Sequence, residues 1–450
     1  MLGAPSPHFP MRRGMTKSQR RTWLTAVGSA IAGIAGLLLP VFATAGAAQA
    51  AGSGIHVSDG RVYEANGSEF VMRGVNHAHT WYPSETGAIA DIAATGANTV
   101  RVVLSSGDRW TETTSAQVSS IISDCKANKV ICVLEVHDTT GYGEDGAAAT
   151  LDQAADYWVG VKSALQGQED YVVVNIGNEP YGNSGYTAWT DATKNAIGKL
   201  RNAGIENALM VDAPNWGQDW SNTMRTNAAS VFASDPRRNT IFSIHMYGVY
   251  DTATEVQNYL NHFVTNKLPI VVGEFGDNHS DGNPDENAIM ATTQSLRVGY
   301  LGWSWSGNGS GVEYLDMVTG FDAGSLTTWG NRFVNGANGI AATSTRATIY
   351  GGGDTGGGDT GGTAPNGYPY CVNGSASDPD GDGWGWENSR SCVVRGSAAD
   401  TGSSGGGDTG GTAPNGYPYC VNGSASDPDG DGWGWENSRS CVVRGSAADR

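Results

Sequence analysis

The chain is poor in positive charge. Its 450 residues contain 27 Lys and Arg against 45 Asp and Glu, which gives a formal net charge of −18 at pH 7. Nucleic-acid binding needs a basic surface that neutralises phosphates, so nucleic acid is not an expected partner. A neutral polymer is compatible with such a surface.

Cysteine is also scarce, with six residues and no Cys-x-x-Cys pair. Zinc binding is disfavoured because no histidine lies near the C-terminal cysteines. The cysteines form pairs that are close in sequence: Cys125 with Cys132, Cys371 with Cys392, and Cys420 with Cys441. An even count fits disulfides in an exported protein. A glycine-rich phosphate loop is missing after the first predicted strand, which argues against a nucleotide-dependent enzyme.

Long apolar runs are confined to the N-terminal part of the chain. Five basic residues and no acidic residue precede an apolar run at 24–43, and Ala48-Gln49-Ala50 follows it. This order is typical of a secretory signal, so we expect residues 1–50 to be removed and the protein to be secreted and extracellular, with no membrane attachment afterwards. A transmembrane anchor is the weaker alternative because Ala and Gly dilute the run. Arg20-Arg21 leaves the general secretory and twin-arginine routes both open.

Strand-like and helix-like segments alternate between residues 54 and 350. Eight apolar, largely β-branched strands are predicted at 70–75, 99–104, 130–136, 171–176, 209–212, 241–246, 270–274 and 300–305. Amphipathic helices are predicted between them, for example at 114–128, 151–164, 186–202 and 252–265. Eight such units indicate a closed (β/α)8 TIM barrel in the α/β class, with a doubly wound open sheet as the alternative.

Two of these strands deliver a glutamate at their C-terminal ends. One leads into Gly177-Asn178-Glu179-Pro180, and the other ends at Glu274. Active sites of such barrels form at the C-terminal ends of the strands. More polar and aromatic residues follow strands at the same end: Asn76, His77, Arg101, His137, His245, Tyr247, Trp303 and Trp305. Paired carboxylates cleave glycosides when one protonates the leaving oxygen and the other attacks the anomeric carbon or activates water.

A known family carries the same motifs. Gly177-Asn178-Glu179-Pro180, His245-Met246-Tyr247, Gly273-Glu274-Phe275-Gly276 and Trp303-Ser304-Trp305 resemble the signature set of glycoside hydrolase family 5. The segments 73–82 and 302–309 are similar to the bacterial endo-β-1,4-mannanases of that family. The resemblance covers residues 54–350 and implies a catalytic domain, which we place at 51–349, that uses no cofactor for catalysis.

The resemblance also implies a mechanism and residue roles. It implies a retaining double displacement in which Glu179 is the acid/base and Glu274 the nucleophile. The residues matching Arg101 and Tyr247 hold the nucleophile in the family, and the asparagine matching Asn178 binds the sugar 2-hydroxyl. An arginine beside Glu274 favours its anionic form, whereas the acid/base must begin protonated.

The remaining substrate contacts are expected on the same rim. The histidines matching His137 and His245 line the cleavage subsite in the family. Trp305 is expected to be the sugar-stacking platform, with Trp303 as the alternative. His77 and Trp81 complete the expected substrate-binding set.

Acidic residues crowd the loop after Glu274. They are Asp277, Asp281, Asp285 and Glu286. Hard oxygen ligands in a short loop could hold a structural calcium ion, which we expect at Asp281, Asp285 and Glu286. A solvated acidic loop without metal is the alternative.

The composition changes after Tyr350. A Gly, Asp and Thr linker at 350–366 leads into a block at 356–400 that recurs unchanged at 405–449. We expect two small β-rich, disulfide-stapled modules at 367–396 and 416–450, joined by a second linker at 397–415. Their Tyr-Pro-x-Cys, Gly-Trp-Gly-Trp-Glu and Ser-Cys motifs resemble carbohydrate-binding module family 10. That resemblance implies binding to cellulose or a similar polysaccharide through Trp384 and Trp386, repeated as Trp433 and Trp435.

The sequence therefore predicts a secreted, monomeric endo-β-1,4-mannanase that acts on mannan, galactomannan and glucomannan and is tethered to plant cell wall by its modules. A β-1,4-glucanase on the same barrel is the nearest alternative, because glucose and mannose differ only in the orientation of the 2-hydroxyl. A non-catalytic polysaccharide-binding protein is disfavoured because both glutamates are present.

Overall fold

The computed structural model describes residues 54–309 and 311–351, and parts of the C-terminal region: 364, 368, 370, 371, 377, 383–387, 390–394, 397–400, 413, 414, 417–420, 426, 427, 432–436 and 439–449. The chain divides into two units, Met1–Gly353 and Asp354–Arg450, which are described separately. The predicted signal at 1–50 and most of both predicted linkers lie outside the described residues. Within the described part of the chain, none of the helices combines the length and apolar composition that a membrane crossing requires.

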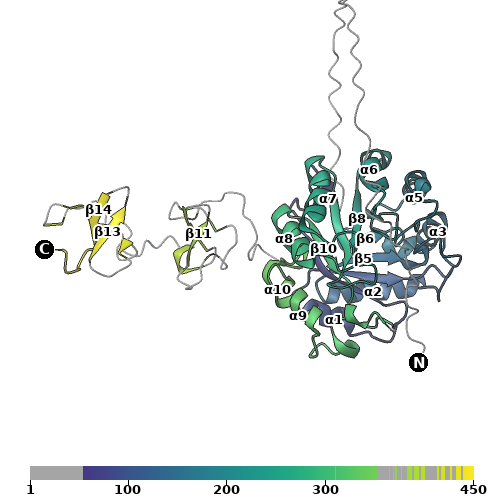
Figure 1. Ribbon diagram of the computed structural model, residues 1–450, viewed down its shortest axis with the longest axis horizontal. Coiled ribbons are helices and arrows are strands. Elements are labelled where there is room, and N and C mark those ends of the chain that lie inside the picture. Colours follow the sequence, from purple (N-terminus) through teal and green to yellow (C-terminus); the bar gives the residue numbers. More distant parts are fainter. Residues whose placement is uncertain are drawn as a thin grey trace, which may run out of the picture. The chain divides into compact units, whose positions relative to one another are not determined.

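The first unit is built on a closed barrel of parallel strands (Figure 1). The strands pair in the order β10-β3-β4-β5-β6-β7-β8-β9, so the last strand pairs with the first. Their bounds are β3 Arg73–His77, β4 Thr99–Leu104, β5 Ile131–Val136, β6 Val172–Asn175, β7 Ala208–Asp212, β8 Thr240–Met246, β9 Ile270–Phe275 and β10 Gly299–Gly302. The closed (β/α)8 prediction is confirmed, and the open-sheet alternative is wrong.

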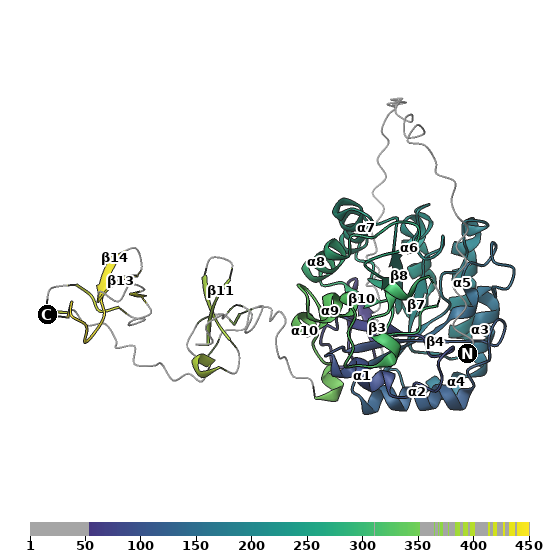
Figure 2. The same cartoon turned by 60° about the horizontal axis from the view of Figure 1, so that its bottom comes forward.

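Helices surround the strands, as Figures 1 and 2 show. The α-helices of the described residues are α1 Ala88–Ala94, α2 Ser115–Ala127, α3 Leu151–Gly160, α4 Lys162–Leu165, α5 Trp189–Asn202, α6 Thr223–Ser234, α7 Ala253–Thr265, α8 Glu286–Leu296, α9 Thr328–Asn335 and α10 Ile340–Thr343. Short 3₁₀ helices are η2 His137–Thr139, η3 Tyr186–Ala188, η4 Glu313–Leu315, η5 Thr319–Phe321, η6 Thr348–Tyr350 and η8 Ala398–Asp400. Thr114 and Thr150 begin α2 and α3 with capping boxes, in which a glutamine three residues later completes the cap.

The interior of the barrel has an apolar layer and a polar layer. The apolar layer consists of seven buried side chains from six strands: Ile131, Val133, Val173, Met210, Ile241, Val271 and Leu301. The polar layer lies toward the C-terminal ends of the strands and is also buried: Asn76, Arg101, Glu135, Asn175, Asp212, His245 and Glu274. Because the apolar layer closes the N-terminal end, the polar layer faces only the C-terminal end of the barrel.

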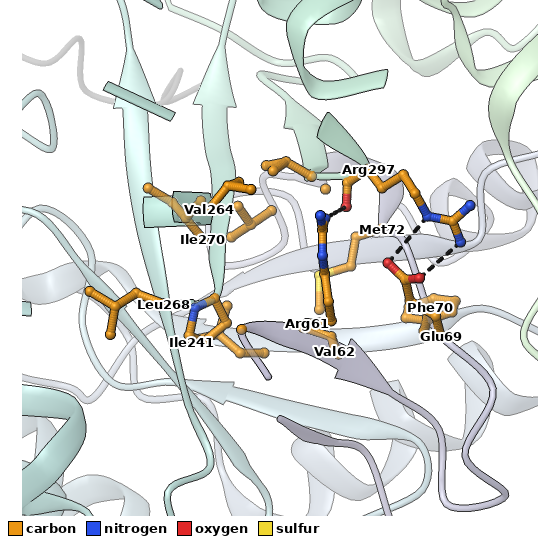
Figure 3. A pocket seen from close by; sticks show the side chains of 15 residues that line it. Arg61, Val62, Glu69, Phe70, Met72, Ile241, Val264, Leu268, Ile270 and Arg297 are labelled. Carbon is orange, nitrogen blue, oxygen red and sulfur yellow. Dashed lines mark hydrogen bonds and ion pairs between the residues drawn. The ribbon is translucent and has the colours of Figure 1, made fainter. Parts of the chain in front are cut away.

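A hairpin of β1 His56–Ser58 and β2 Arg61–Tyr63 lies beside the N-terminal strand ends. A small pocket next to it is shown in Figure 3. Arg61 crosses this pocket and donates to the carbonyl of Leu296 at 2.5 Å, and Arg297 pairs with Glu69 at 2.9 Å. The remaining volume of about 20 Å³ has room for about one water molecule, so this pocket is not a substrate site.

Cys125 and Cys132 differ from the expected pairing. Both are buried free thiols, and the Cys125 thiol donates to Cys132 Sγ at 2.6 Å. Burial raises the pKa of the Cys132 thiol well above its ordinary value. In the structure the two side chains pack as small buried groups between α2 and β5.

The C-terminal modules each contain one two-stranded antiparallel sheet. β11 Trp384–Glu387 pairs with β12 Arg390–Val393, and β13 Trp433–Glu436 pairs with β14 Arg439–Val442. Disulfides join Cys371 to Cys392 and Cys420 to Cys441, which confirms the predicted staples. Gly385 is required beside the first disulfide, since an added Cβ would lie 2.7 Å from Cys371 Sγ.

Candidate active site

Glu179 and Glu274 meet at the C-terminal end of the barrel. Glu179 follows β6 and Glu274 lies within β9, and each is only 4% exposed. His245 of β8 lies between them, with its Nδ1 atom 2.8 Å from Glu179 Oε1 and 3.5 Å from Glu274 Oε2. One carboxylate oxygen of each glutamate and a His245 nitrogen all lie within 4.8 Å of one another. Two carboxyl groups so close together can act on the same bond.

Arg101 organises the polar layer from β4. Its guanidinium donates to Glu274 Oε1 at 2.8 Å and to Asp212 Oδ2 at 3.1 Å. Further bonds go to the side-chain oxygens of Asn76 at 2.9 Å, Asn175 at 2.8 Å and Asn178 at 2.8 Å. These bonds use all five N–H donors of a guanidinium. Burial opposes the charge, but the surrounding carboxylates raise the pKa of Arg101, so it is a fixed cation under Glu274.

Glu274 has a second donor on its other oxygen. The hydroxyl of Tyr247 donates to Glu274 Oε2 at 3.0 Å. Burial raises the pKa of the Glu274 carboxyl, while His245 and Arg101 act in the opposite direction. Arg101 and Tyr247 therefore bind one oxygen each and leave the carboxylate in one orientation.

A cation at His245 balances the acidic groups. Its Nε2 atom lies 3.3 Å from Asp212 Oδ2. Burial lowers the pKa of His245, but the neighbouring carboxylates of Glu274 and Asp212 raise it by more. The resulting pKa of His245 is about 10. Burial likewise disfavours the Asp212 carboxylate, yet His245 and Arg101 bring the pKa of Asp212 down to about 2. The imidazolium is thus shared among three carboxyl groups.

Two glycines make room for this histidine. The pairing of β8 with β9 shifts register between Ile244 and His245, which places His245 beside Glu274. Gly273 lies at that irregularity, where an added Cβ would come within 2.2 Å of Ser243 Oγ. Gly217 has a φ of +69° and packs on the ring, where a Cβ would lie 2.6 Å from His245. Its carbonyl also accepts the His245 backbone N–H at 2.8 Å.

A cleft opens above the two glutamates. It is lined by Ala78, Trp81, Arg109, Trp110, His137, Thr140, Asn178, Glu179, Tyr247, Glu274, His279, Trp303, Gly307, Asn308, Gly309, Val312 and Leu315. His137 stacks on Trp303, with ring centroids 5.6 Å apart and planes at 25°, and meets Trp81 edge-on at 5.1 Å. Aromatic walls beside buried carboxyl groups suit a sugar, whose flat apolar faces stack on aromatic rings.

Four of the predicted substrate-binding residues do not line this cleft: Arg101, His245, His77 and Trp305. Arg101 and His245 lie beneath it in the buried polar layer. Trp305 is fully buried, and its backbone N–H donates to the carbonyl of Asn76 at 2.9 Å, so its predicted role as the stacking platform is wrong. Trp303 lines the cleft instead. The reason is that β10 ends at Gly302, so strand alternation does not extend to these tryptophans. His77 is also buried, against Phe321 and His79.

The acidic loop residues do not form a cation site together. Asp281 accepts from His279, from Gln218 and from the backbone of Gly248, while Asp285 caps α8 by accepting from Ala288 N at 2.8 Å. Among the described residues, the one group of three His, Cys, Asp or Glu side chains with metal-ligand spacing is Glu179, His245 and Glu274. The structure therefore does not support calcium at Asp281, Asp285 and Glu286.

Several residues of the site were not predicted from the sequence. They are Glu135 and Asp212 in the polar layer, and Arg109, Trp110, Thr140, His279 and Asn308 in the cleft wall. Asp212 ends the fifth barrel strand, so the strand-end rule that found Glu179 could have found it. The cleft-wall residues come from loops, where no strand pattern marks their direction. Asn308 accepts the indole N–H of Trp303 at 2.8 Å and so fixes its orientation.

The aromatic residues of the modules are described in part. Trp384 meets Tyr368 and Trp433 meets Tyr417, each edge-on at 4.8 Å and 89°. In the second module Trp433 is 37% and Tyr417 46% exposed. The side chains of Trp386 and Trp435 lie outside the described residues. One Trp and one Tyr in each module thus form a perpendicular pair, which is exposed in the second module and partly buried in the first.

Comparison with protein families assigns both parts of the chain. Residues 63–309 match the cellulase (glycosyl hydrolase family 5) model. Residues 360–394 and 409–443 match a cellulose or protein binding domain, CBM_10.

Comparison with single proteins gives close relatives. A mannan endo-1,4-beta-mannosidase of Streptomyces lividans is 76% identical over 386 residues, which cover 85% of this chain and 100% of that protein. A mannan endo-1,4-beta-mannosidase of Cellvibrio japonicus is 57% identical, covering 77% of this chain and 81% of that protein. The solved β-mannanase of Thermomonospora fusca has 61% identity and a TM-score of 0.66, covering 66% of this chain and 99% of that chain.

Proposed function

Because the chain belongs to glycosyl hydrolase family 5, we propose that it is an endo-β-1,4-mannanase that cleaves internal bonds of mannan, galactomannan and glucomannan. The observation that carries this proposal is the 76% identity, over the full length of that relative, to a mannan endo-1,4-beta-mannosidase. The buried pair Glu179 and Glu274 beneath an aromatic cleft supplies the chemistry. Enzymes of this family act without a cofactor.

The proposed mechanism is retaining. Retaining glycosidases keep their carboxyl groups about 5–5.5 Å apart, whereas inverting enzymes need about 6.5–9.5 Å to admit a water. The Glu179 and Glu274 oxygens that lie within 4.8 Å of each other support the retaining geometry.

The contacts of the glutamates support different roles. Glu274 is bound by the cation Arg101 and by the Tyr247 hydroxyl, which favours a carboxylate that attacks the anomeric carbon. Among the described residues no arginine contacts Glu179, and its cationic neighbour is His245 at 2.8 Å. In its proposed role the Glu179 carboxyl starts with a proton and gives it to the leaving glycosidic oxygen as that bond breaks. In the second step Glu179 takes a proton from water, whose oxygen attacks the anomeric carbon and releases Glu274. The β-configuration is kept because the carbon is inverted twice.

The rest of the chain supports action on solid polysaccharide outside the cell. The basic and apolar segment within residues 1–50 supports export, and the two CBM_10 matches support tethering to plant cell wall. We place the modules at 367–396 and 416–450 and expect the protein to act as a monomer.

Two measurements on the full chain test the proposal. Initial rates on glucomannan, galactomannan, unbranched mannan and carboxymethyl-cellulose should favour the mannans, and a preference for carboxymethyl-cellulose would assign a glucanase instead. Proton NMR during early hydrolysis should show the β-anomer of the new reducing end first. First appearance of the α-anomer would contradict the retaining mechanism.

Variants of the two glutamates test their roles. E274A should abolish hydrolysis, since no nucleophile remains. E179A should lose most activity on mannan. On an aryl β-mannoside whose leaving group departs without a proton, it should regain turnover with azide, which attacks the glycosyl-enzyme without needing a base and forms a β-glycosyl azide. Azide rescue of E274A giving the α-azide, with none for E179A, would exchange the two roles.

A further inference from the structure

Glu135 is a buried acid for which the proposed mechanism has no use. It lies on β5 and is 0% exposed. Its Oε1 atom lies 2.7 Å from His137 Nδ1, and 3.7 Å from the Arg101 guanidinium. Its Oε2 atom is buried and has no hydrogen-bond partner among the described residues. Burying a carboxylate oxygen that has no hydrogen-bond partner costs free energy, so another contact of Glu135 must offset that cost.

That contact is with a residue of the cleft wall. His137 lines the cleft, stacks on Trp303 and meets Trp81 edge-on. Its other nitrogen, Nε2, lies 3.5 Å from Asn178 Nδ2, at the limit of a hydrogen bond. The bond to Glu135 is therefore the short polar contact that fixes the rotation of the imidazole ring.

The surroundings indicate that both partners are uncharged near neutral pH. Burial raises the pKa of Glu135 to about 8, although Arg101 and His245 oppose it and Asp212 and Asp138 add to it. Burial lowers the pKa of His137 to about 4. Neutral partners also suit the unpartnered Oε2 atom, because burying a neutral oxygen costs less than burying a charged one.

We propose that Glu135 is a positioning residue for the hydrolysis, and that it holds the His137 ring in the cleft wall through the 2.7 Å hydrogen bond to Nδ1. The substrate side of this inference rests on the proposed function. The shape and hydrogen-bonding capacity of Glu135 matter in this arrangement, and its negative charge does not. A glutamine has the same shape and both a donor and an acceptor.

Substitution in the full chain tests the contact. E135Q should keep kcat/KM on mannan within about threefold at pH 6, whereas E135A should lose about 10–100-fold, by analogy with the removal of a partner that orients a metal-binding histidine. The double variant E135A/H137A should lose no more than H137A alone, because both changes remove one contact. Equal losses for E135Q and E135A, or additive losses in the double variant, would overturn the proposal.

The pH dependence gives a readout that a purely packing role would not move. The unfolded carboxyl ionises from its ordinary pKa of 4.5, so rising pH between 4.5 and about 8 should destabilise the wild-type fold more than the E135Q fold. The melting temperature of E135Q minus that of wild type should therefore increase across this interval.

This melting measurement needs no substrate. A difference that stays flat from pH 4.5 to 8 would overturn the uncharged state of Glu135 whatever the enzyme hydrolyses. If the melting-temperature difference rises with pH but the protein hydrolyses no mannan, the proposed function is contradicted and the inference about the Glu135 contact stands.

Discussion

Asp212 Oδ2 lies 3.3 Å from His245 Nε2, on the side of the imidazole opposite Glu179 and Glu274. The same carboxylate accepts from Arg101 at 3.1 Å. Asp212 therefore contacts both cations of the polar layer while touching neither the cleft nor the expected substrate. Its charge determines how firmly His245 keeps its proton beside Glu179.

Replacing Asp212 by asparagine should reduce activity with little change of shape. D212N removes the charge that helps to raise the pKa of His245 to about 10, so the alkaline limb of the kcat/KM profile should move to lower pH. We expect kcat/KM at pH 7 to fall at least about tenfold, or about 1.4 kcal/mol in the activation barrier. Steady-state kinetics across pH 5–10 would measure both effects.

Asp235→Asn is the matched control for this variant. Asp235 is equally buried and pairs with Arg201 at 2.9 Å, outside the cleft. D235N should lower the melting temperature and leave the pH profile in place. An unchanged pH profile in D212N would show that Asp212 does not control His245.

The stability of the fold should fall on the alkaline side. The folded pKa of His245 is raised from 6.5 to about 10, so its stabilisation is complete below pH 6.5 and lost as the pH rises through about 10. The melting temperature of wild type should decrease over that interval, and D212N should complete this loss at lower pH. Parallel melting curves for the two proteins would contradict the coupling.

Trp303 and Trp305 should respond differently to the same substitution. W303F removes part of a cleft wall and the bond to Asn308, so we expect a loss of about 0.5–1.5 kcal/mol in substrate binding, up to about tenfold in KM. W305F leaves a cavity in the core and should cost about 1–3 kcal/mol of unfolding free energy with little change in KM. Denaturant unfolding and kinetics of both variants would measure this contrast. A KM effect confined to W305F would restore the stacking role first expected for that residue.

Gly217 should tolerate no side chain. G217A forces a Cβ within 2.6 Å of the His245 ring, so kcat should fall about tenfold or more. G204A is the control, because Gly204 also has positive φ (+84°) but nothing within 4 Å of an added Cβ. Both variants should lose about 1 kcal/mol of stability from backbone strain, while only G217A should lose turnover. Equal kcat in the two variants would exclude steric control of His245.

Because the two modules are linked in one chain, they should bind solid polymer more tightly together than either module does alone. Because their sequences are identical, W384A and W433A should weaken binding to insoluble mannan or cellulose to the same extent. Linked sites can exceed either single affinity by about 10²–10⁴-fold, so each variant should lose most of that gain and the double variant nearly all binding. Rates on soluble mannan should be unchanged. Pull-down isotherms with the solid polymers would measure this, and full binding by the double variant would remove these tryptophans from the binding face.

The barrel and the two glutamates could be predicted because strand patterns carry that information. Buried strands alternate along the sequence, and the residues that end them must meet at one rim. Asp212 follows the same rule, although the sequence reading assigned it no role. Glu135 is the next-to-last residue of β5, the position that Glu274 has in β9, so the same rule could have found it, although the sequence does not show its partner.

The tryptophans show where such reasoning stops. The pattern of Trp303 and Trp305 fits a continuing strand, yet β10 ends at Gly302 and the two rings separate into cleft and core. The loop residues Trp110 and Asn308 join the cleft through tertiary contacts that no local period encodes. Whether an acidic loop gathers its carboxylates, as at Asp281 and Asp285, is likewise decided by neighbours distant in sequence.

The apolar layer beneath the polar layer closes one end of the barrel interior and leaves the other end open. Side chains such as Ile131, Met210 and Leu301 close its bottom, so solvent reaches the glutamates only from the cleft. In the proposed reaction, incoming polymer, departing fragment and hydrolytic water must then share one entrance. The departing half of the polysaccharide has to leave this entrance before water can attack the glycosyl-enzyme. The closed end of the barrel therefore sets the order of these two steps.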